Sequence, residues 1–309
     1  MDDQTAQIAK AVAALRGGGL VILPTETVYG LAADAANARA VAAVYAAKGR
    51  PSFNPLIAHV ADVAMARKIA RFDERAERLA AQFWPGPLTL VLPVADEAAV
   101  CDLARAGLDT VALRAPGHPL AHALLRAFGG PLVAPSANRS GRPSPTTFAD
   151  AVEETGVSAA AGLDGGPCRI GLESTVVALL DEPRLLRPGS VTRAQIEAVI
   201  GPLSEADADA KRSPGRLARH YAPNASVRLD AAAPRPGEAF LAFGPADARG
   251  RTWNLSPTRD LAEAAANLFA HLRAADRSGA SAIAIAPIPA EGLGEAINDR
   301  LRRAAGFVG

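Results

Sequence analysis

The feature that most constrains the fold of this 309-residue chain is a repeated pattern in which a short apolar run ends in polar residues. Its first instance is the run Leu20–Leu23, which leads into the polar segment 24–27 (PTET) and then into a helix-like stretch over Asn37–Ala47. Lys48 and Arg50 follow at the end of that stretch. Ligands of open α/β sheets bind beyond the carboxyl ends of strands. Two cations so close together, in a loop restricted by Gly and Pro, suit an anion such as a polyphosphate.

Alternation of apolar strands with amphipathic helices continues to about residue 201 and predicts an α/β fold. Strands are predicted at Leu56–Val60, Leu88–Leu92, Thr110–Arg114, Leu132–Ala134, Ala159–Asp164, Ser174–Leu180 and Leu185–Arg187. Helices are predicted at Thr5–Arg16, Asp62–Ala70, Asp73–Phe83 and His118–Phe128, with a last one that begins at the capping-box sequence Thr192–Gln195 and ends near Gly201.

The pattern changes at residues 202–223, which lack apolar periodicity and predict a linker or lid. After it, strands are predicted at Val227–Leu229, Phe240–Phe243 and Ile283–Pro287, and helices at Asp260–Ser278 and Leu293–Ala305. We therefore predict three parts: a first domain over 1–201, the linker over 202–223, and a small parallel α/β domain over 224–309.

Composition excludes several classes of protein. The net charge is +1, which gives no overall electrostatic case for binding nucleic acid. No apolar run approaches the roughly 20 residues that cross a bilayer, and the acidic N-terminus lacks a signal-peptide pattern. The two cysteines, Cys101 and Cys168, are not spaced for a metal and are expected to be free thiols. We expect a soluble cytoplasmic protein without membrane contact.

Four groups of polar residues follow the predicted strands and are candidates for a site. They are Thr25, Glu26 and Thr27; Lys48, Arg50 and Asn54; Arg114; and Ser136, Asn138 and Ser144. Each has a structural alternative. The threonines, Ser136 and Asn138 are also turn formers, and Lys48 is also a favourable charge at a helix C-terminus. Glu26 and Arg114 are equally interpretable as members of ion pairs, and His59 as a structural histidine.

The sequence has no motif for covalent catalysis or for a standard phosphate loop: GxSxG, GxxxxGK[ST] and HExxH are absent. What remains is a cationic, hydroxyl-rich cavity. Such a cavity catalyses by positioning and charge stabilisation, as in phosphoryl or nucleotidyl transfer.

Six ordered blocks in residues 8–200 resemble the YrdC-like threonylcarbamoyl-AMP synthases. They are PTETVYGL (24–31), KGRPSFNPL (48–56), WPGPLTLVL (84–92), RAPGHP (114–119), APSANRSGRPSPT (134–146), and LESTVV followed by LRPG. The tail, with His220-Tyr221-Ala222-Pro223, resembles the longer two-domain form of the family. The resemblance implies a YrdC-like twisted mixed sheet with helices around a large cationic cavity, and a small Rossmann-like C-terminal domain.

The resemblance also implies a reaction. L-threonine, bicarbonate and ATP, with Mg²⁺, would give L-threonylcarbamoyl-adenylate and pyrophosphate. A tRNA threonylcarbamoyl-transfer complex would receive the product and modify the adenosine beside the anticodon. The implied catalytic set is Lys48, Arg50, Ser136 and Asn138. ATP would be bound by Arg50, Asn54, Thr110, Ser136, Ser144, Arg187 and Tyr221, with Tyr221 closing over the nucleotide. Threonine would be bound by Thr27, His59, Arg114, Ala134 and Ser174.

Two other functions are compatible with a YrdC-like domain. One is an RNA-binding or assembly factor, which the near-neutral charge and scarce aromatics disfavour. Direct binding of tRNA is left open. The other is carbamoyl transfer from carbamoyl phosphate, as in larger hydrogenase-maturation proteins. Those proteins contain zinc-binding segments, and the two cysteines of this chain are too few to form them.

Overall fold

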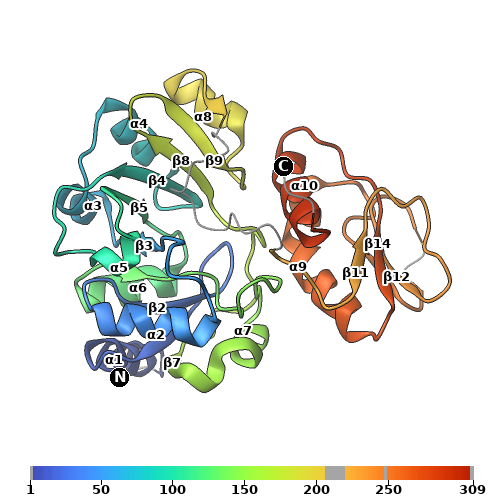
Figure 1. Cartoon of the computed structure of the whole chain (residues 1–309), viewed down its shortest axis with the longest axis horizontal. Coiled ribbons are helices and arrows are strands. Elements are labelled where there is room, and N and C mark those ends of the chain that lie inside the picture. Colours follow the sequence, from blue (N-terminus) through green and yellow to red (C-terminus); the bar gives the residue numbers. More distant parts are fainter. Residues whose placement is uncertain (1–2, 206–219, 247–248, 307–309) are drawn as a thin grey trace.

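The computed structural model describes residues 3–205, 220–246 and 249–306, which form a large N-terminal domain and a smaller C-terminal one (Figure 1). Within these residues the first domain contains one ten-stranded mixed sheet. Its strands, in spatial order, are β10 (Ser204–Glu205), β9 (Pro183–Arg187), β8 (Thr175–Leu179), β4 (Leu88–Pro93), β5 (Thr110–Arg114), β3 (Ile57–His59), β6 (Leu132–Val133), β2 (Gly30–Asp34), β1 (Leu20–Leu23) and β7 (Ala159–Gly162). Four neighbouring pairs, β10/β9, β8/β4, β5/β3 and β1/β7, are parallel and the others antiparallel, so the predicted mixed sheet is confirmed.

Helices cover this sheet on both faces. They are α1 (Asp3–Arg16), α2 (Ala38–Lys48), α3 (Val63–Ile69), α4 (Glu74–Phe83), α5 (Asp102–Arg105), α6 (Pro119–Phe128), α7 (Phe148–Thr155) and α8 (Arg193–Ile200), with a 3-10 turn at Gly156–Ser158. Buried side chains of α2, α3, α4 and α8 share one core with the sheet, and those of α1 and α6 share another. The first residues of three predicted helices are their caps: Asn37, Asp62 and Asp73 each accept backbone N–H groups through the side chain. The predicted capping box of Thr192 and Gln195 forms.

Strand alternation decides which side chains reach the functional face of the sheet. In β5, Val111 and Leu113 join the helix-covered core, whereas Ala112 joins a small apolar cluster on the opposite face. Thr110 and Arg114 share the parity of Ala112 and therefore its face. They stand at opposite ends of the strand, Arg114 at its carboxyl end.

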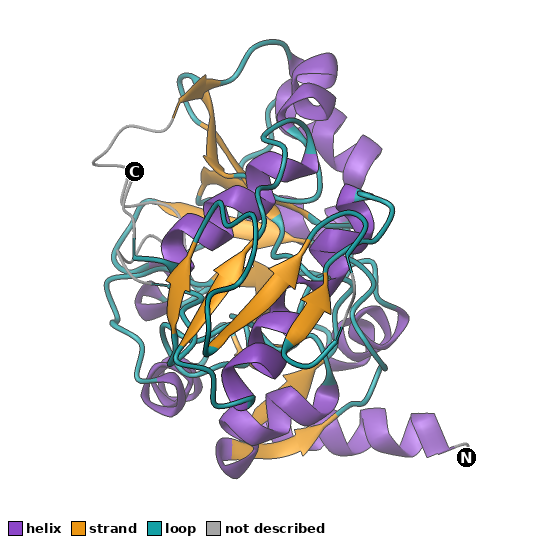
Figure 2. Cartoon of the chain, turned by 90° about the vertical axis from the view of Figure 1, so that its right-hand side faces the viewer, coloured by secondary structure: helices purple, strands orange, loops and turns teal. Residues whose placement is uncertain are grey.

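The second domain has a parallel sheet in the order β11 (Ser226–Arg228), β14 (Ala282–Ile285), β12 (Glu238–Ala242) and β13 (Thr252–Asn254). Figure 2, in which this domain faces the viewer, shows its strands side by side. Helices α9 (Leu261–Arg277) and α10 (Leu293–Ala304) pack their buried residues against one face of that sheet. Both helices lie on the side that faces the first domain (Figure 1). The predicted small parallel domain is confirmed.

The two domains share buried apolar surface. Val28 and Leu172 of the first domain belong to the same core as α9 and α10. At Gly171, which has φ +74, an added Cβ would lie 2.6 Å from backbone atoms of Ala265 and Ala266 in α9. Glycine is therefore required there both for the left-handed backbone conformation and for the close approach of the helix.

Several elements were not predicted from the sequence. β2 reads GLAAD, which lacks the β-branched residues typical of strands, and forms because β1 and β6 pair with its two edges. α5 has four residues, too few for a periodic signal, and β13 and β10 are strands of three and two residues. α7, of eight residues, was also not predicted. Of the predicted linker, residues 206–219 lie outside the described part of the chain. No helix among the described residues is long and apolar enough to span a bilayer.

Candidate active site

A cavity with about 510 Å³ of empty space, including its open mouth, lies at the functional face of the large sheet. The predicted site residues that line it are Thr27, Arg50, His59, Arg114, Ala134, Ser136, Ser174, Arg187 and Tyr221. They come from segments spread over almost 200 residues of sequence. The structure therefore brings together loops that leave different strands, as the sequence predicts.

The other predicted site residues are buried but do not line the cavity. They are Lys48, Asn54, Thr110, Asn138 and Ser144. Thr110 starts β5 beside Pro93, at the opposite end of the strand from Arg114. The sequence analysis did not assign seven lining residues: Val28, Pro55, Leu56, Ile57, Pro135, Glu173 and His220. Glu173 and His220 lie inside two sequence blocks that had been noted, LESTVV and His-Tyr-Ala-Pro. A charged or titratable side chain within such a block is a signal by which both could have been predicted as site residues.

The turn after β1 holds Arg114 at one wall of the cavity. Thr25 Oγ donates to Val28 O at 2.6 Å and accepts two turn N–H groups at 3.2 Å, so this threonine builds the turn. Arg114 donates to Gly86 O at 3.2 Å, to Thr27 Oγ1 at 2.8 Å and to Glu26 Oε1 at 2.6 Å. Glu26 is thus a partner in a buried ion pair, with both side chains at most 7% exposed. Burial raises the pKa of Glu26, but attraction to Arg114 outweighs it and leaves the pKa below the usual carboxyl value.

His59 lies beside this pair, because the parallel register of β3 and β5 sets His59 opposite Arg114. Burial and the neighbouring Arg114 charge lower the pKa of His59 to about 3, so the imidazole is neutral at physiological pH. Its Nδ1 is buried and has no hydrogen-bond partner among the described residues. His59 lines the cavity, and an unpartnered neutral imidazole nitrogen beside a cavity is a candidate partner for a polar ligand atom.

Lys48 is hydrogen-bonded to the backbone of the loop 134–146. Its Nζ donates to the carbonyl oxygens of Ser136 and Asn138, and its own carbonyl accepts from Ser140 N at 2.7 Å. Burial, and repulsion from Arg50, lower the pKa of Lys48 well below its usual value. The structure therefore places the Lys48 ammonium against the loop backbone rather than on the cavity wall.

Arg50 carries positive charge to the cavity from the loop after α2. It donates to Pro55 O at 3.2 Å, and its Nε is buried without a hydrogen-bond partner among the described residues. The Asn54 and Asn138 Oδ1 atoms are likewise buried and unpartnered within the described part of the chain. Burial lowers the pKa of Arg50 to about 10, so the guanidinium remains charged at neutral pH. Of these three residues only Arg50 lines the cavity, and its unmet donor is one that a polar ligand could satisfy.

The opposite wall is a hydrogen-bonded set around Glu173 and Ser174. Arg187 donates to Ser174 O at 2.9 and 3.1 Å and to Ser174 Oγ at 3.1 Å. Glu173 accepts from Ser144 Oγ and, at 3.1 Å, from Arg300 Nε of the second domain. Ser144 is thus connected to the cavity through Glu173. Burial lowers the pKa of Arg187 from its usual value.

His220 and Tyr221 close the site on the side of the second domain. Tyr221 is 1% exposed, and its ring centroid lies 5.4 Å from that of Phe269 in α9. The Arg300 guanidinium carbon lies 5.6 Å from the Tyr221 ring centroid. Ala222 N donates to Gly141 O at 2.7 Å, which joins this segment to the loop 134–146. Tyr221 therefore belongs to the core of the second domain and to the cavity wall at once.

Three guanidinium groups, Arg50, Arg114 and Arg187, face a cavity whose lining includes one carboxylate, Glu173. That balance favours an anionic ligand. No group of three or more His, Cys, Asp or Glu side chains within the described ranges is arranged to hold a metal ion. Cys101 and Cys168 are free, as expected. The guanidinium and hydroxyl groups of the lining supply binding, orientation and charge stabilisation.

The chain was compared with family models, with curated proteins and with solved structures. A family model described as "Telomere recombination" matches residues 13–189, and one described as "Threonylcarbamoyl-AMP synthase, C-terminal domain" matches residues 191–306. A threonylcarbamoyl-AMP synthase of Bacillus subtilis (strain 168) is 41% identical, with 97% of this chain and 93% of that protein covered. One from Schizosaccharomyces pombe is 34% identical, with 93% and 85% covered. The crystal structure of P. abyssi Sua5 complexed with L-threonine matches with a TM-score of 0.91 at 38% identity, covering 99% of this chain and 96% of that one.

The fold and the basic cavity together define the class: a two-domain α/β protein with a YrdC-like first domain. Two long relatives with the same name and two family models cover nearly all of the chain. The chain belongs to the threonylcarbamoyl-AMP synthase family, and it is an enzyme.

Proposed function

We propose that this enzyme forms L-threonylcarbamoyl-adenylate from L-threonine, bicarbonate and ATP, with release of pyrophosphate. The observation that carries the proposal is the meeting of Arg50, Arg114 and Arg187 with the hydroxyls of Ser136 and Ser174 at one cavity. The chemistry requires an amino acid, a carbamate formed from it, and a triphosphate in one enclosed space. Positioning and charge stabilisation are sufficient for it, without a covalent nucleophile.

We place threonine beside Arg114, His59 and Thr27. The Arg114 guanidinium has five N–H groups, and its hydrogen bonds to Gly86, Thr27 and Glu26 use three of them. The remaining N–H groups are suited to the threonine carboxylate. The neutral His59 Nδ1 is an acceptor or donor for the amine or hydroxyl of threonine. In support, the matched P. abyssi structure is a complex with L-threonine.

We place ATP between Arg50, the loop 134–146 and Arg187. Asn54, Ser144 and Thr110, which are buried outside the cavity lining, belong to the same predicted set. Arg50 is oriented to stabilise charge on the phosphates as the carbamate oxygen attacks the α-phosphate and pyrophosphate leaves. Lys48 acts in this proposal mainly by fixing the carbonyls of Ser136 and Asn138, which orients both side chains. Tyr221 closes the nucleotide end.

Mg²⁺ would arrive as the magnesium complex of ATP. Because the described residues offer no clustered carboxylates for it, we propose that phosphate oxygens and water supply most of its ligands, as is common for this ion.

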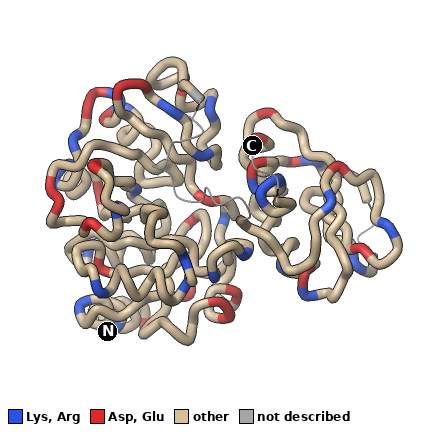
Figure 3. Tube along the Cα trace, viewed as in Figure 1, with Lys and Arg blue, Asp and Glu red and all other residues tan. Residues whose placement is uncertain are grey.

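The product would pass to a tRNA threonylcarbamoyl-transfer complex in the cytoplasm, where ATP and tRNA are available. Figure 3 shows basic and acidic residues interspersed over the described parts of both domains. Interspersed charge is unlike the basic tracks of single-strand RNA grooves, so the proposed role concerns the small-molecule intermediate rather than the RNA itself.

The test is pyrophosphate release from ATP with threonine and bicarbonate supplied or omitted in turn, with the adenylate product identified by mass spectrometry. We expect release to require both substrates. Pyrophosphate release that continues unchanged without threonine would refute the substrate assignment. Tight tRNA binding without any turnover would favour the RNA-binding alternative.

A further inference from the structure

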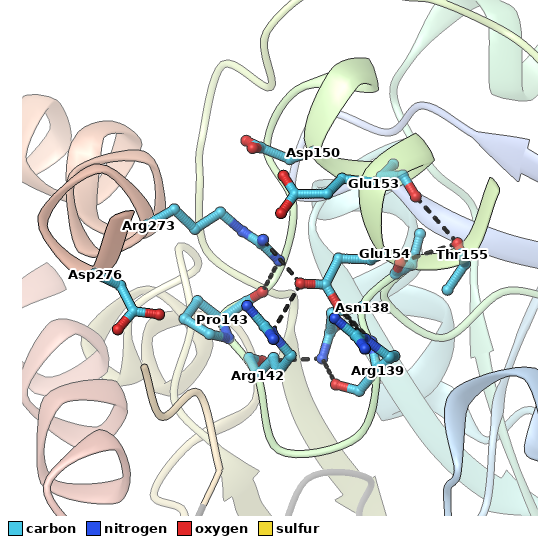
Figure 4. Close-up of polar contacts among 12 residues, drawn as sticks. Asn138, Arg139, Arg142, Pro143, Asp150, Glu153, Glu154, Thr155, Arg273 and Asp276 are labelled. Atoms are coloured by element: carbon cyan, nitrogen blue, oxygen red, sulfur yellow. Dashed lines mark hydrogen bonds and ion pairs between the residues drawn. The ribbon is translucent and has the colours of Figure 1, made fainter. Parts of the chain in front are cut away.

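Three arginines converge on one buried carboxylate between the two domains (Figure 4). Glu154, near the end of α7, has a fully buried side chain. Its carboxylate accepts from Arg139 N at 3.0 Å and Arg139 Nε at 3.3 Å, and pairs with Arg142 Nε at 2.9 Å and Arg273 Nη1 at 3.0 Å. Arg273 comes from α9 of the second domain and is 4% exposed. We call Glu154 with these three arginines the Glu154 cluster.

The Glu154 cluster holds the loop that carries three predicted site residues, Ser136, Asn138 and Ser144. Besides its bond to Glu154, Arg273 donates from Nη2 to the carbonyl oxygen of Pro143, the residue before Ser144. The Asn138 amide donates to the carbonyls of Arg139 and Arg142 at 2.8 and 2.9 Å. The loop backbone therefore depends on this cluster on one side, as it depends on Lys48 on the other.

The position of Arg273 is costly to maintain. A buried guanidinium loses its hydration, which its hydrogen bonds must offset. Its Nε remains buried without a hydrogen-bond partner among the described residues. A buried, incompletely satisfied cation that touches the nucleotide loop from another domain is better explained by a role in shaping the loop than by domain adhesion.

We propose that Arg273 is a positioning residue for the ATP-binding loop, and that the C-terminal domain completes the active site through it. One guanidinium fixes Glu154 and the Pro143 carbonyl together and so sets the conformation of residues 138–144. The inference rests on the proposed function, because it assigns these residues to ATP. Of the five residues assigned to threonine, Thr27, His59, Arg114 and Ser174 lie outside the loop, and Ala134 precedes residues 138–144.

Arg277 provides a matched control. It lies one turn further along the same helix and contacts the same helix of the first domain, through Asp150 Oδ1 at 2.6 Å and Glu153 Oε2. None of its contacts within the described residues reaches the loop 138–144. Arg277 is 49% exposed and Arg273 4%, so Arg277→Met controls for the loss of a contact between α9 and α7 but not for the loss of a buried one. Weakened joining of the domains would also raise hydrogen exchange in α9, whereas loop positioning would raise it in the loop alone.

The experiment compares Arg273→Met and Arg277→Met in full-length enzyme. For Arg273→Met we expect kcat/KM for ATP to fall about 10- to 100-fold, since small misplacements of positioned groups have effects of that order. Calorimetric threonine affinity without ATP should stay within about twofold, by the placement of its ligands outside the loop. Arg277→Met should match wild type in both. Arg273→Lys should recover part of the loss, because an ammonium can serve one of the two acceptors well but not both in the fork geometry.

Hydrogen exchange gives a readout that does not depend on catalysis. Peptides spanning 137–145 should exchange faster in Arg273→Met than in wild type or Arg277→Met, with the α9 peptides unchanged. Equal losses in both methionine variants, or equal loss of threonine and ATP binding, would overturn the inference. So would normal ATP kinetics in Arg273→Met. If the methionine variant does not fold, Arg273→Lys carries the same comparison. Wild-type enzyme without threonine-dependent turnover would refute the proposed function, while the exchange comparison would still decide the role of Arg273.

Discussion

The substitution Glu26→Gln measures how much the buried ion pair of Glu26 and Arg114 contributes to the free energy of unfolding. Glu26 and Arg114 are 7% and 4% exposed in their side chains, with 2.6 Å between Oε1 and Nη2. Removing one member of a buried pair costs about 3–5 kcal/mol because the other charge stays buried and uncompensated. Glutamine retains an acceptor oxygen, and Arg114 keeps its bonds to Thr27 and Gly86. We therefore expect a loss of about 2–3 kcal/mol in the free energy of unfolding of the first domain.

A surface pair of the same type gives the control. Arg67 and Glu77 are joined at 2.7 Å, but their side chains are 56% and 37% exposed. Solvent screening makes such a pair contribute little, so Glu77→Gln should leave unfolding almost unchanged. Urea denaturation at pH 7, followed by circular dichroism, measures both variants. A Glu26→Gln midpoint no lower than that of Glu77→Gln would refute the argument that burial makes the difference.

The pH dependence of that measurement has a defined sign. The pKa of Glu26 is lower in the folded protein than in the unfolded chain, so the native state binds fewer protons at acidic pH. The contribution of the pair is present above the usual carboxyl pKa and is lost as pH falls through the depressed value. The difference between wild type and Glu26→Gln should therefore narrow on acidification below that range. A difference that grows on acidification would contradict the assigned direction.

Three further predictions concern the cavity. Arg50→Ala should lower kcat about 10²- to 10³-fold with the fold retained, since it removes a charge stabiliser. Lys48→Ala should lower both the rate and the urea midpoint of unfolding, because it leaves two buried loop carbonyls unpaired. Near-wild-type rates in both variants would refute the site assignment. Tyr221→Ala should weaken ATP binding in calorimetry more than it weakens threonine binding, and unchanged ATP affinity would remove the closing role of this ring. His59, with a pKa of about 3, should stay neutral in NMR titrations from pH 8 to 5, and a His59 resonance that titrates above pH 5 would contradict this. Because the unfolded residue protonates near pH ~6.5, the free energy of unfolding of the wild type should fall as pH drops below that value, and that of His59→Gln should fall less.

Much of the fold was predictable because periodic burial leaves a strong signal. The strand at Leu20–Leu23 was predicted with its observed bounds, and the caps of α2, α3, α4 and α8 were read from single residues. β2 was missed because its alanines and glycine gain strand structure only from neighbours on both sides. The helix α7, which carries Glu154, was also missed, although α8 of equal length was found from its capping box.

The site shows the same division. The convergence of strand-end residues was predictable, because ligands of open α/β sheets bind beyond the carboxyl ends of strands. The strand pairing that sets His59 opposite Arg114 was not predicted. The contacts that each charged side chain makes were not predictable. Whether Lys48 faces the cavity or the loop carbonyls, and whether Arg114 is free or paired with Glu26, depends on atoms contributed from other segments. Short-range sequence patterns carry no information on such contacts.

The amino-acid sequence by itself determined the α/β class, the chemical nature of the cavity and the family. Local propensity, alternation and motif order suffice for these, because each acts over a few neighbouring residues. Only the tertiary structure decided that Arg273 and Arg300 of the second domain hold Glu154 and Glu173 of the first. Those pairs join residues more than 100 positions apart, and they form only where packing of α9 and α10 against the first domain removes water and sets the geometry of the charges.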